Sequence, residues 1–189
     1  MSLEKVNVVV DTTVISQTKQ WIEAVVIGLN FCPFAKRVFD KNLITYQIAN
    51  NESTVDDLIS LIALCKELDQ NNELETGFVI YPNKLADFND YLDFLELANQ
   101  LLCEQEYEGI YQLASFHPQY CFDGTEIDAA ENYTNRSPYP MLHLLRELSL
   151  EKALEQFDAP EEIPVRNIEV ANQKGADFFS NILENISND

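Results

Sequence analysis

The chain has few basic residues: Lys and Arg together number 12 against 32 Asp and Glu, so its formal net charge at pH 7 is −20. A field of this sign repels phosphate backbones and anionic lipid headgroups. We therefore expect neither nucleic acid nor a membrane surface as a partner. The acidity itself is an ordinary source of solubility.

Long apolar runs are also missing. No run approaches the ~20 residues that span a bilayer, and the N-terminus, Met1 to Lys5, lacks the charged and apolar regions of a signal peptide. The four cysteines are far apart and form no CxxC pair: Cys32, Cys65, Cys103 and Cys121. Together these absences predict a cytoplasmic protein with reduced thiols.

Motifs for cofactors and metals are absent as well. The chain contains no Gly-x-Gly-x-x-Gly, Walker loop or Gly-x-Ser-x-Gly elbow. Its cysteines and histidines lack the short spacing of structural zinc sites. The acidic cluster between Asp123 and Glu131 lacks the glycine-centred pattern of a calcium loop. We therefore predict no cofactor and no metal.

Length and composition suit one globular domain of 189 residues, 46% of them apolar and 23% charged. Residues 1–12, which include Val8-Val9-Val10, are expected to be a tail or a short strand, and residues 13–187 a single α/β domain. Apolar periodicity predicts five helices: from about Thr13 to Gly28, from Ser53 with a face of Val55, Leu58, Ile62 and Cys65, from Asp87 to about Cys103, near Met141–Phe157, and over 162–183.

Strands are expected at 43–48, 78–81 and 110–116. Because strands separated by helices pair in parallel, the predicted fold is a small, mostly parallel three- or four-stranded sheet with helices packed on it. Right-handed crossovers place Tyr81 to Lys84 and His117-Pro118 at the same carboxyl edge. Open α/β sheets usually bind ligands at that edge.

Two polar segments hold the candidate site residues. In the first, Pro33 at a first helical position would make Cys32 the N-cap of a short helix with Lys36 and Arg37. The helix start and both cations favour a reactive thiolate, and the alternative is a small, buried, inert residue. Asn30, Lys36 and Arg37 are predicted to contact the substrate.

The second segment begins at His117, which is either a general base or a residue that ties the loop to the backbone. Arg136 at a helix start suits a carboxylate or phosphate, unless the polar loop is a turn that satisfies itself. His143, Arg146 and Glu147 would share one helical face, as part of the site or as a surface network. The predicted substrate-binding residues of this segment are Asn132, Tyr133, Asn135, Arg136, Arg146 and Glu147.

Four strings carry a resemblance: Val26 to Ala35, Ala114 to Pro118, Glu131 to Pro140 and Leu142 to Glu147. Through them the chain resembles an uncharacterised bacterial family that is catalogued as a domain of unknown function, number fourteen-fifteen in that series. The match covers about Lys19 to Asn181. The resemblance implies a single cytoplasmic domain in bacteria and transfers no activity or catalytic residue.

The leading hypothesis is an enzyme acting on a small anionic molecule, with Cys32, His117 and His143 as catalytic residues. Arg136 and Arg37 would hold the anion, His117 would move a proton and Cys32 would be a nucleophile or redox-sensitive thiol. The first alternative is a non-catalytic metabolite-binding or regulatory domain that uses the same pocket. The second is a partner-binding protein whose acidic surface meets a basic protein.

Overall fold

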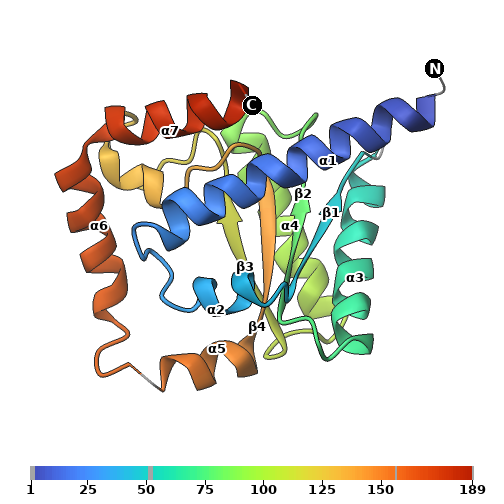
Figure 1. The fold of residues 1–189 in the computed structure, drawn as a ribbon. Coiled ribbons are helices and arrows are strands. Elements are labelled where there is room, and N and C mark those ends of the chain that lie inside the picture. Colours follow the sequence, from blue (N-terminus) through green and yellow to red (C-terminus); the bar gives the residue numbers. More distant parts are fainter. Residues whose placement is uncertain (1–2, 51–52, 156, 189) are drawn as a thin grey trace.

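The computed structural model describes the backbone of residues 3–50, 53–155 and 157–188, and their side chains from Asp11 onward. A four-stranded sheet lies between two layers of helices (Figure 1). The elements in chain order are α1 (Leu3–Trp21), the π-helix η1 (Ile22–Ile27), α2 (Ala35–Asp40), β1 (Ile44–Ile48), α3 (Thr54–Gln70), β2 (Thr76–Ile80), α4 (Phe88–Glu104), β3 (Tyr111–Phe116), the 3₁₀-helix η2 (Ala130–Thr134), β4 (Met141–Arg146), α5 (Glu147–Leu154), α6 (Glu162–Lys174) and α7 (Ala176–Asn188).

The strand order is β1-β2-β4-β3. β1 and β2 pair in parallel, whereas β4 is antiparallel to both β2 and β3. The predicted single α/β domain with a four-stranded sheet is confirmed, but mostly parallel pairing is wrong because β4 is inserted against the direction of the other three. β1, β2 and β3 still run the same way, so their carboxyl ends share one edge.

β4 is the element that the sequence misplaces, since residues 141–146 were expected to begin a helix. Leu142 and Leu144 are fully buried on one side of the sheet, and Met141 and His143 lie on the other. A central strand that is covered on both faces has a nearly continuous apolar sequence, which periodicity cannot distinguish from a buried helix. The helix begins only at Glu147.

The N-terminal expectation of a tail or short strand is also wrong, because the backbone is helical from Leu3 onward.

The later helices agree better with the helices predicted from the sequence. Ser53 caps α3 by accepting the Asp56 N–H (3.2 Å), and Asp87 caps α4. Of the face predicted for α3, Leu58, Ile62 and Cys65 pack in the core and Val55 is 65% exposed. Leu61, Leu64 and Leu68 complete the buried face. The helix expected over 162–183 is divided into α6 and α7 at Gly175, whose φ is +79°.

α1 ends in a π-turn that depends on Gly28. The Gly28 N–H donates to Glu23 O, five residues back, at 2.9 Å. A Cβ on Gly28 would lie 2.4 Å from the carbonyl oxygen of Ala24. The backbone must therefore shift to accept any side chain there.

We expect Gly28→Ala to lower the free energy of unfolding by about 1–2 kcal/mol, because a methyl group forced into a packed turn costs that much. Urea denaturation measures the change. An ordinary Gly-to-Ala change in a helix stabilises by roughly 0.5–1 kcal/mol. A stabilised variant would therefore contradict the observed π-turn geometry.

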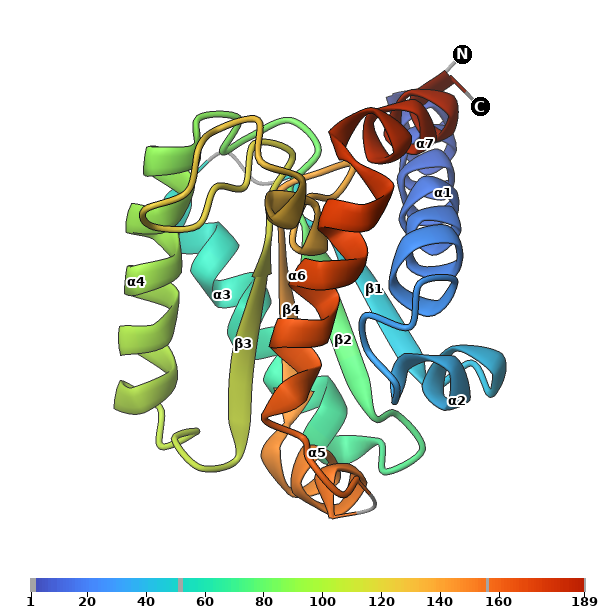
Figure 2. The same ribbon diagram turned by 90° about the vertical axis from the view of Figure 1, so that its left-hand side faces the viewer.

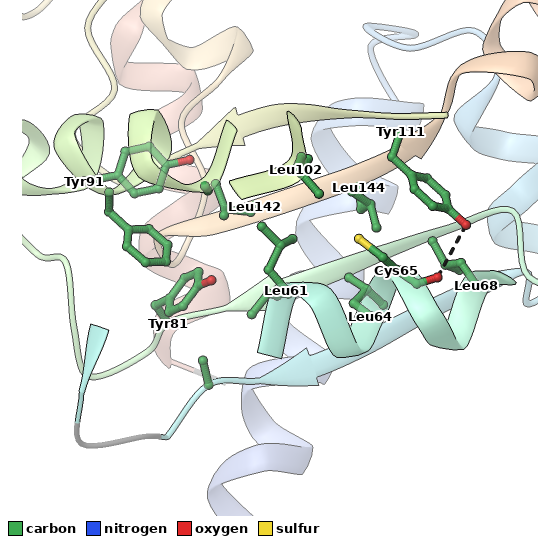
Figure 3. Packing of buried hydrophobic residues seen from close by; sticks show 14 residues of the cluster. Leu61, Leu64, Cys65, Leu68, Tyr81, Tyr91, Leu102, Tyr111, Leu142 and Leu144 are labelled. Carbon is green, nitrogen blue, oxygen red and sulfur yellow. Dashed lines mark hydrogen bonds between the residues drawn. The ribbon is translucent and has the colours of Figure 1, made fainter. Parts of the chain in front are cut away.

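Two apolar cores flank the sheet. On one side α3 and α4 pack on the strands, with Leu61, Leu64 and Leu68 of α3 against Leu142 and Leu144 of β4 (Figure 3). On the other side the core is formed by residues of α1, η1, α6 and α7 with Phe78, Ile80 and Met141 of the sheet. Each face of the sheet therefore has its own helical layer.

The second layer covers its face incompletely. α6 packs on η2 and α7, and in Figure 2 it crosses in front of β4, while no helix crosses in front of β3. Gln112 of β3 is exposed and Ala114 is partly exposed on this side. Within the described residues, no helix is long and apolar enough to cross a membrane.

Candidate functional site

The two histidines lie on opposite sides of the sheet. His117, directly after β3, is fully buried against the rings of Phe88 and Tyr91 from α4. His143, in the middle of β4, stacks on Phe78 on the side of α1 and α6. The two predicted catalytic imidazoles therefore do not converge on one site.

Both ring nitrogens of His117 are bonded to the backbone. Nδ1 accepts the Gln119 N–H (3.0 Å), so Nε2 carries the proton and donates to Leu85 O (2.8 Å). Burial lowers the pKa of His117, and the Leu85 hydrogen bond opposes this shift more weakly. The ring thus joins the loops after β2 and β3, which confirms that both loops lie at one edge of the sheet. Its geometry matches a residue that ties down a loop.

The polar loop after His117 also bonds to itself. The buried amide of Asn132 accepts from Phe122 N–H (3.0 Å) and the Thr125 hydroxyl (2.9 Å) and donates to Glu126 O (2.9 Å). Asn135 donates to Ser115 O at 3.1 Å. The loop therefore matches the alternative of a turn that satisfies its own polar groups.

The predicted anion-binding Arg136 is part of the same network. Its Nε donates to Tyr120 O (3.0 Å), one Nη donates to Ile127 O, and its guanidinium lies 4.6 Å from the centre of the Tyr133 ring. Tyr133 in turn stacks on Phe179 and bonds to Ser180 (2.7 Å). The guanidinium is thus occupied by loop carbonyls.

The predicted helical face of His143, Arg146 and Glu147 is wrong, because residues 141–146 form a strand. Arg146 points to the opposite side from His143 and donates to Tyr111 OH (3.0 Å), Leu74 O (3.3 Å) and Leu68 O. Glu147 begins α5, and its N–H bonds to Ile110 O (3.0 Å).

The basic residues of the first segment are at the surface. α2 begins at Ala35, later than predicted, and its Lys36 and Arg37 pair with Asp40 (2.7 Å) and Glu75 (3.3 Å). Asn30 uses its carbonyl to accept from Arg166 of α6 at 2.9 Å. Exposed pairs of this kind contribute little free energy.

Cys32 is partly buried and follows Phe31, which belongs to the core on the side of α1 and α6. Burial raises the pKa of its thiol, and hydrogen bonds from the backbone of Phe34 and Ala35 lower it by less. The predicted N-cap role of Cys32 is wrong, because the N-cap of α2 is Phe34, and the pKa of the thiol is shifted in the opposite direction to the one expected. At neutral pH the residue is a thiol.

A feature that the sequence analysis missed is a row of rings across the sheet. Tyr46 of β1 stacks on Phe78 of β2 (centroids 5.7 Å apart, planes at 6°), and Phe78 stacks on His143 of β4 (4.0 Å, 7°). These residues are direct cross-strand neighbours. The fourth member of the row, opposite His143 on β3, is Ala114.

The row ends where the sheet is incompletely covered. His143, Ala114 and Leu145 are partly exposed, although they lie on or beside a central strand. Leu142 and Leu144, on the other face of the same strand, are fully buried. Each of these three residues therefore keeps part of its surface open while most of it is buried, and we name the three together the stack-end site.

Among the described residues, His143 has a hydrogen-bond partner at only one of its two ring nitrogens. Its Nε2 lies 2.6 Å from the Thr76 hydroxyl, which donates to Leu144 O. Desolvation lowers the pKa of His143 to about 3. The neutral form of the ring is therefore the main form at neutral pH.

Two shallow hollows lie elsewhere on the surface. One of about 60 Å³ is lined by Lys19, Phe39, Asn42, Ile44 and Tyr46 at the other end of the ring row. The other, of about 160 Å³, lies along α1 between Thr12 and Gln20. Neither includes a predicted site residue. In the described part of the chain, no three His, Cys, Asp or Glu side chains are grouped to hold a metal.

A family model described as "Protein of unknown function (DUF1415)" matches residues 13–181. The chain belongs to this family. The match spans both polar segments and all four strands. No curated protein and no solved structure shows significant similarity to the chain. Membership therefore carries no activity over to it, and the function must be argued from the geometry.

Proposed function

We propose that the protein is a non-catalytic binding or regulatory domain that holds a small planar molecule at the stack-end site. The observation that carries this proposal is the unfinished row of parallel rings, Tyr46, Phe78 and His143, beside the partly exposed Ala114. This is the metabolite-binding alternative, placed on the sheet face instead of at its carboxyl edge.

The geometry of the row favours a flat ligand. Phe78 covers one face of the imidazole. The cross-strand neighbour on the other face contributes only a methyl group, and neighbouring strands lie about 4.8 Å apart. Phe116 approaches His143 only at 6.2 Å and a tilt of 39°. A planar group above Ala114 would extend the stack, and aromatic pairs in such contact gain about 0.5–1.5 kcal/mol beyond their buried area.

The catalytic hypothesis has less geometric support. His117 would have to release a backbone hydrogen bond to move a proton, and Arg136 would have to release loop carbonyls to hold an anion. Cys32 is a thiol instead of a thiolate. The anionic substrate expected from the sequence is therefore not part of this proposal.

Ala114→Phe tests the site by filling it. We expect the new ring to complete the row, so that the variant folds but no longer binds ethylbenzene, a flat probe without hydrogen-bonding groups. Titration with ethylbenzene, followed by the NMR signals of the Ala114 methyl and the His143 ring in the native protein, should give saturable shifts. In Ala114→Phe the shifts at His143 should fall at least tenfold.

Ala114→Ser is the matched control, because it changes the same residue but leaves the position open. Its binding should stay within about threefold of the native protein. Ethylbenzene that binds Ala114→Phe as well as the native protein would contradict the proposal. So would native protein without saturable shifts at His143.

A further inference from the structure

The hydrogen bonds around His143 determine which of its nitrogens faces a ligand. A threonine hydroxyl has one proton, and Thr76 donates it to Leu144 O, which can only accept. The Thr76 oxygen is therefore an acceptor toward His143, and Nε2 must carry the imidazole proton and donate it. Nδ1 is left with an unprotonated lone pair.

This lone pair is available. No residue in the described part of the chain donates a hydrogen bond to Nδ1 of His143. In that same part, the buried side-chain nitrogen and oxygen atoms without a partner are Trp21 Nε1 and Tyr81 OH, so Nδ1 is not among the buried atoms. The neutral ring thus offers an accessible acceptor at the stack-end site.

Charge narrows the choice of ligand. A carboxylate or phosphate would place its oxygen lone pairs against the lone pair of Nδ1. Arg136 and Arg146, the two arginines nearest to His143 in the sequence, do not offset this repulsion, since both are bonded to other groups of the protein. The net charge of −20 adds a long-range preference for neutral or cationic molecules.

The direction of the Nδ1 lone pair restricts the shape of the ligand. A stacked ring lies over the face of the imidazole, whereas Nδ1 accepts hydrogen bonds in the imidazole plane. One molecule satisfies both only if its donor is on a short arm that bends out of the plane of its own ring.

On the basis of the proposed function, we infer that the ligand is an arylalkyl amine or alcohol. Its flat ring stacks on His143, and the N–H or O–H on its one- or two-carbon arm donates to Nδ1. The preference of this ligand class is for neutral or cationic molecules, opposite to the anion expected from the sequence.

Four probes with the same ring test the inference: ethylbenzene, 2-phenylethanol, 2-phenylethylamine and 3-phenylpropionate. We expect the alcohol and the amine to bind about tenfold more tightly than ethylbenzene, which corresponds to one hydrogen bond of about 1.4 kcal/mol. The carboxylate should bind more weakly than ethylbenzene. The ¹⁵N resonance of Nδ1 should move only with the two donors.

His143→Phe is the decisive variant, because it keeps a stacking ring and removes the acceptor. It should still bind ethylbenzene but lose the preference for the alcohol and the amine. If all four probes bind the native protein equally, the donor inference is wrong while the binding site stands. If the carboxylate binds best, the inference is also wrong. If none binds, the proposed function itself fails.

Discussion

Arg146→Met is expected to lower the free energy of unfolding by about 3 kcal/mol. Arg146 is the point where β4, the end of α3 and the start of β3 are joined, through Leu68 O, Leu74 O and Tyr111 OH. The last carbonyls of a helix have no partner within the helix. Each part-buried group left without a hydrogen bond costs about 1–3 kcal/mol, so the loss of this guanidinium has a large effect.

Urea denaturation measures the change, with Lys36→Met as the matched control. That substitution removes the same kind of charge from an exposed pair with Asp40, and its effect should stay within about 0.5 kcal/mol. Ethylbenzene binding should survive in folded Arg146→Met, because Arg146 points away from the stack-end site. An effect no larger than that of the control would contradict the assigned role of Arg146.

The second large effect is a loss of stability in acid that depends on His143. Its pKa is about 3 in the folded protein, against 6.5 for a free side chain. The unfolded chain therefore takes up a proton below pH 6.5, whereas the folded protein does not until about pH 3. Stability from this residue is complete above pH 6.5 and is lost as the pH falls.

Between pH 7.5 and pH 5, the native protein should lose about 2 kcal/mol more stability than His143→Phe. Denaturant unfolding of both proteins across this range gives the difference. The pKa of His117 is also lowered, but that residue is present in both proteins and cancels. Parallel pH profiles would show that His143 is not desolvated as described.

The parts of the fold that the sequence predicted well are determined by local chemistry. Ser53 and Asp87 mark helix starts because their side chains accept the free N–H groups of the first turn. β2 and β3 were identified from short apolar runs next to Pro82 and Gly109. The order of these elements predicts that Tyr81 to Lys84 and His117-Pro118 lie at the same edge of the sheet.

Local chemistry does not predict β4, because the apolar pattern of a strand depends on its position in the sheet. β4 lies between β2 and β3, and its residues on both faces are buried or partly buried, so its apolar residues do not alternate with polar ones. The error reached the site, because a helix puts His143 and Arg146 on one face whereas a strand puts them on opposite faces. The wrong assignment of residues 141–146 as a helix therefore led to the wrong prediction that His143, Arg146 and Glu147 lie together.

The candidate site was misjudged for a different reason. The residue types of Asn132, Asn135 and Arg136 predict ligand binding, because such residues hold anions. A long loop with buried backbone needs the same groups to satisfy its own carbonyls and amides, and composition does not separate the two uses. The ring row, in contrast, depends on the register of Tyr46, Phe78 and His143 across three strands, which no local pattern encodes.

The most direct test of the stack-end site is an intermolecular nuclear Overhauser measurement between ethylbenzene and the protein. The chain has only two histidines, so the His143 ring protons can be assigned with His143→Phe. We predict contacts from the aromatic protons of ethylbenzene to the ring of His143 and to the methyl group of Ala114. Contacts at His117, or at the hollow beside Lys19 and Tyr46, with none at His143 would contradict the account.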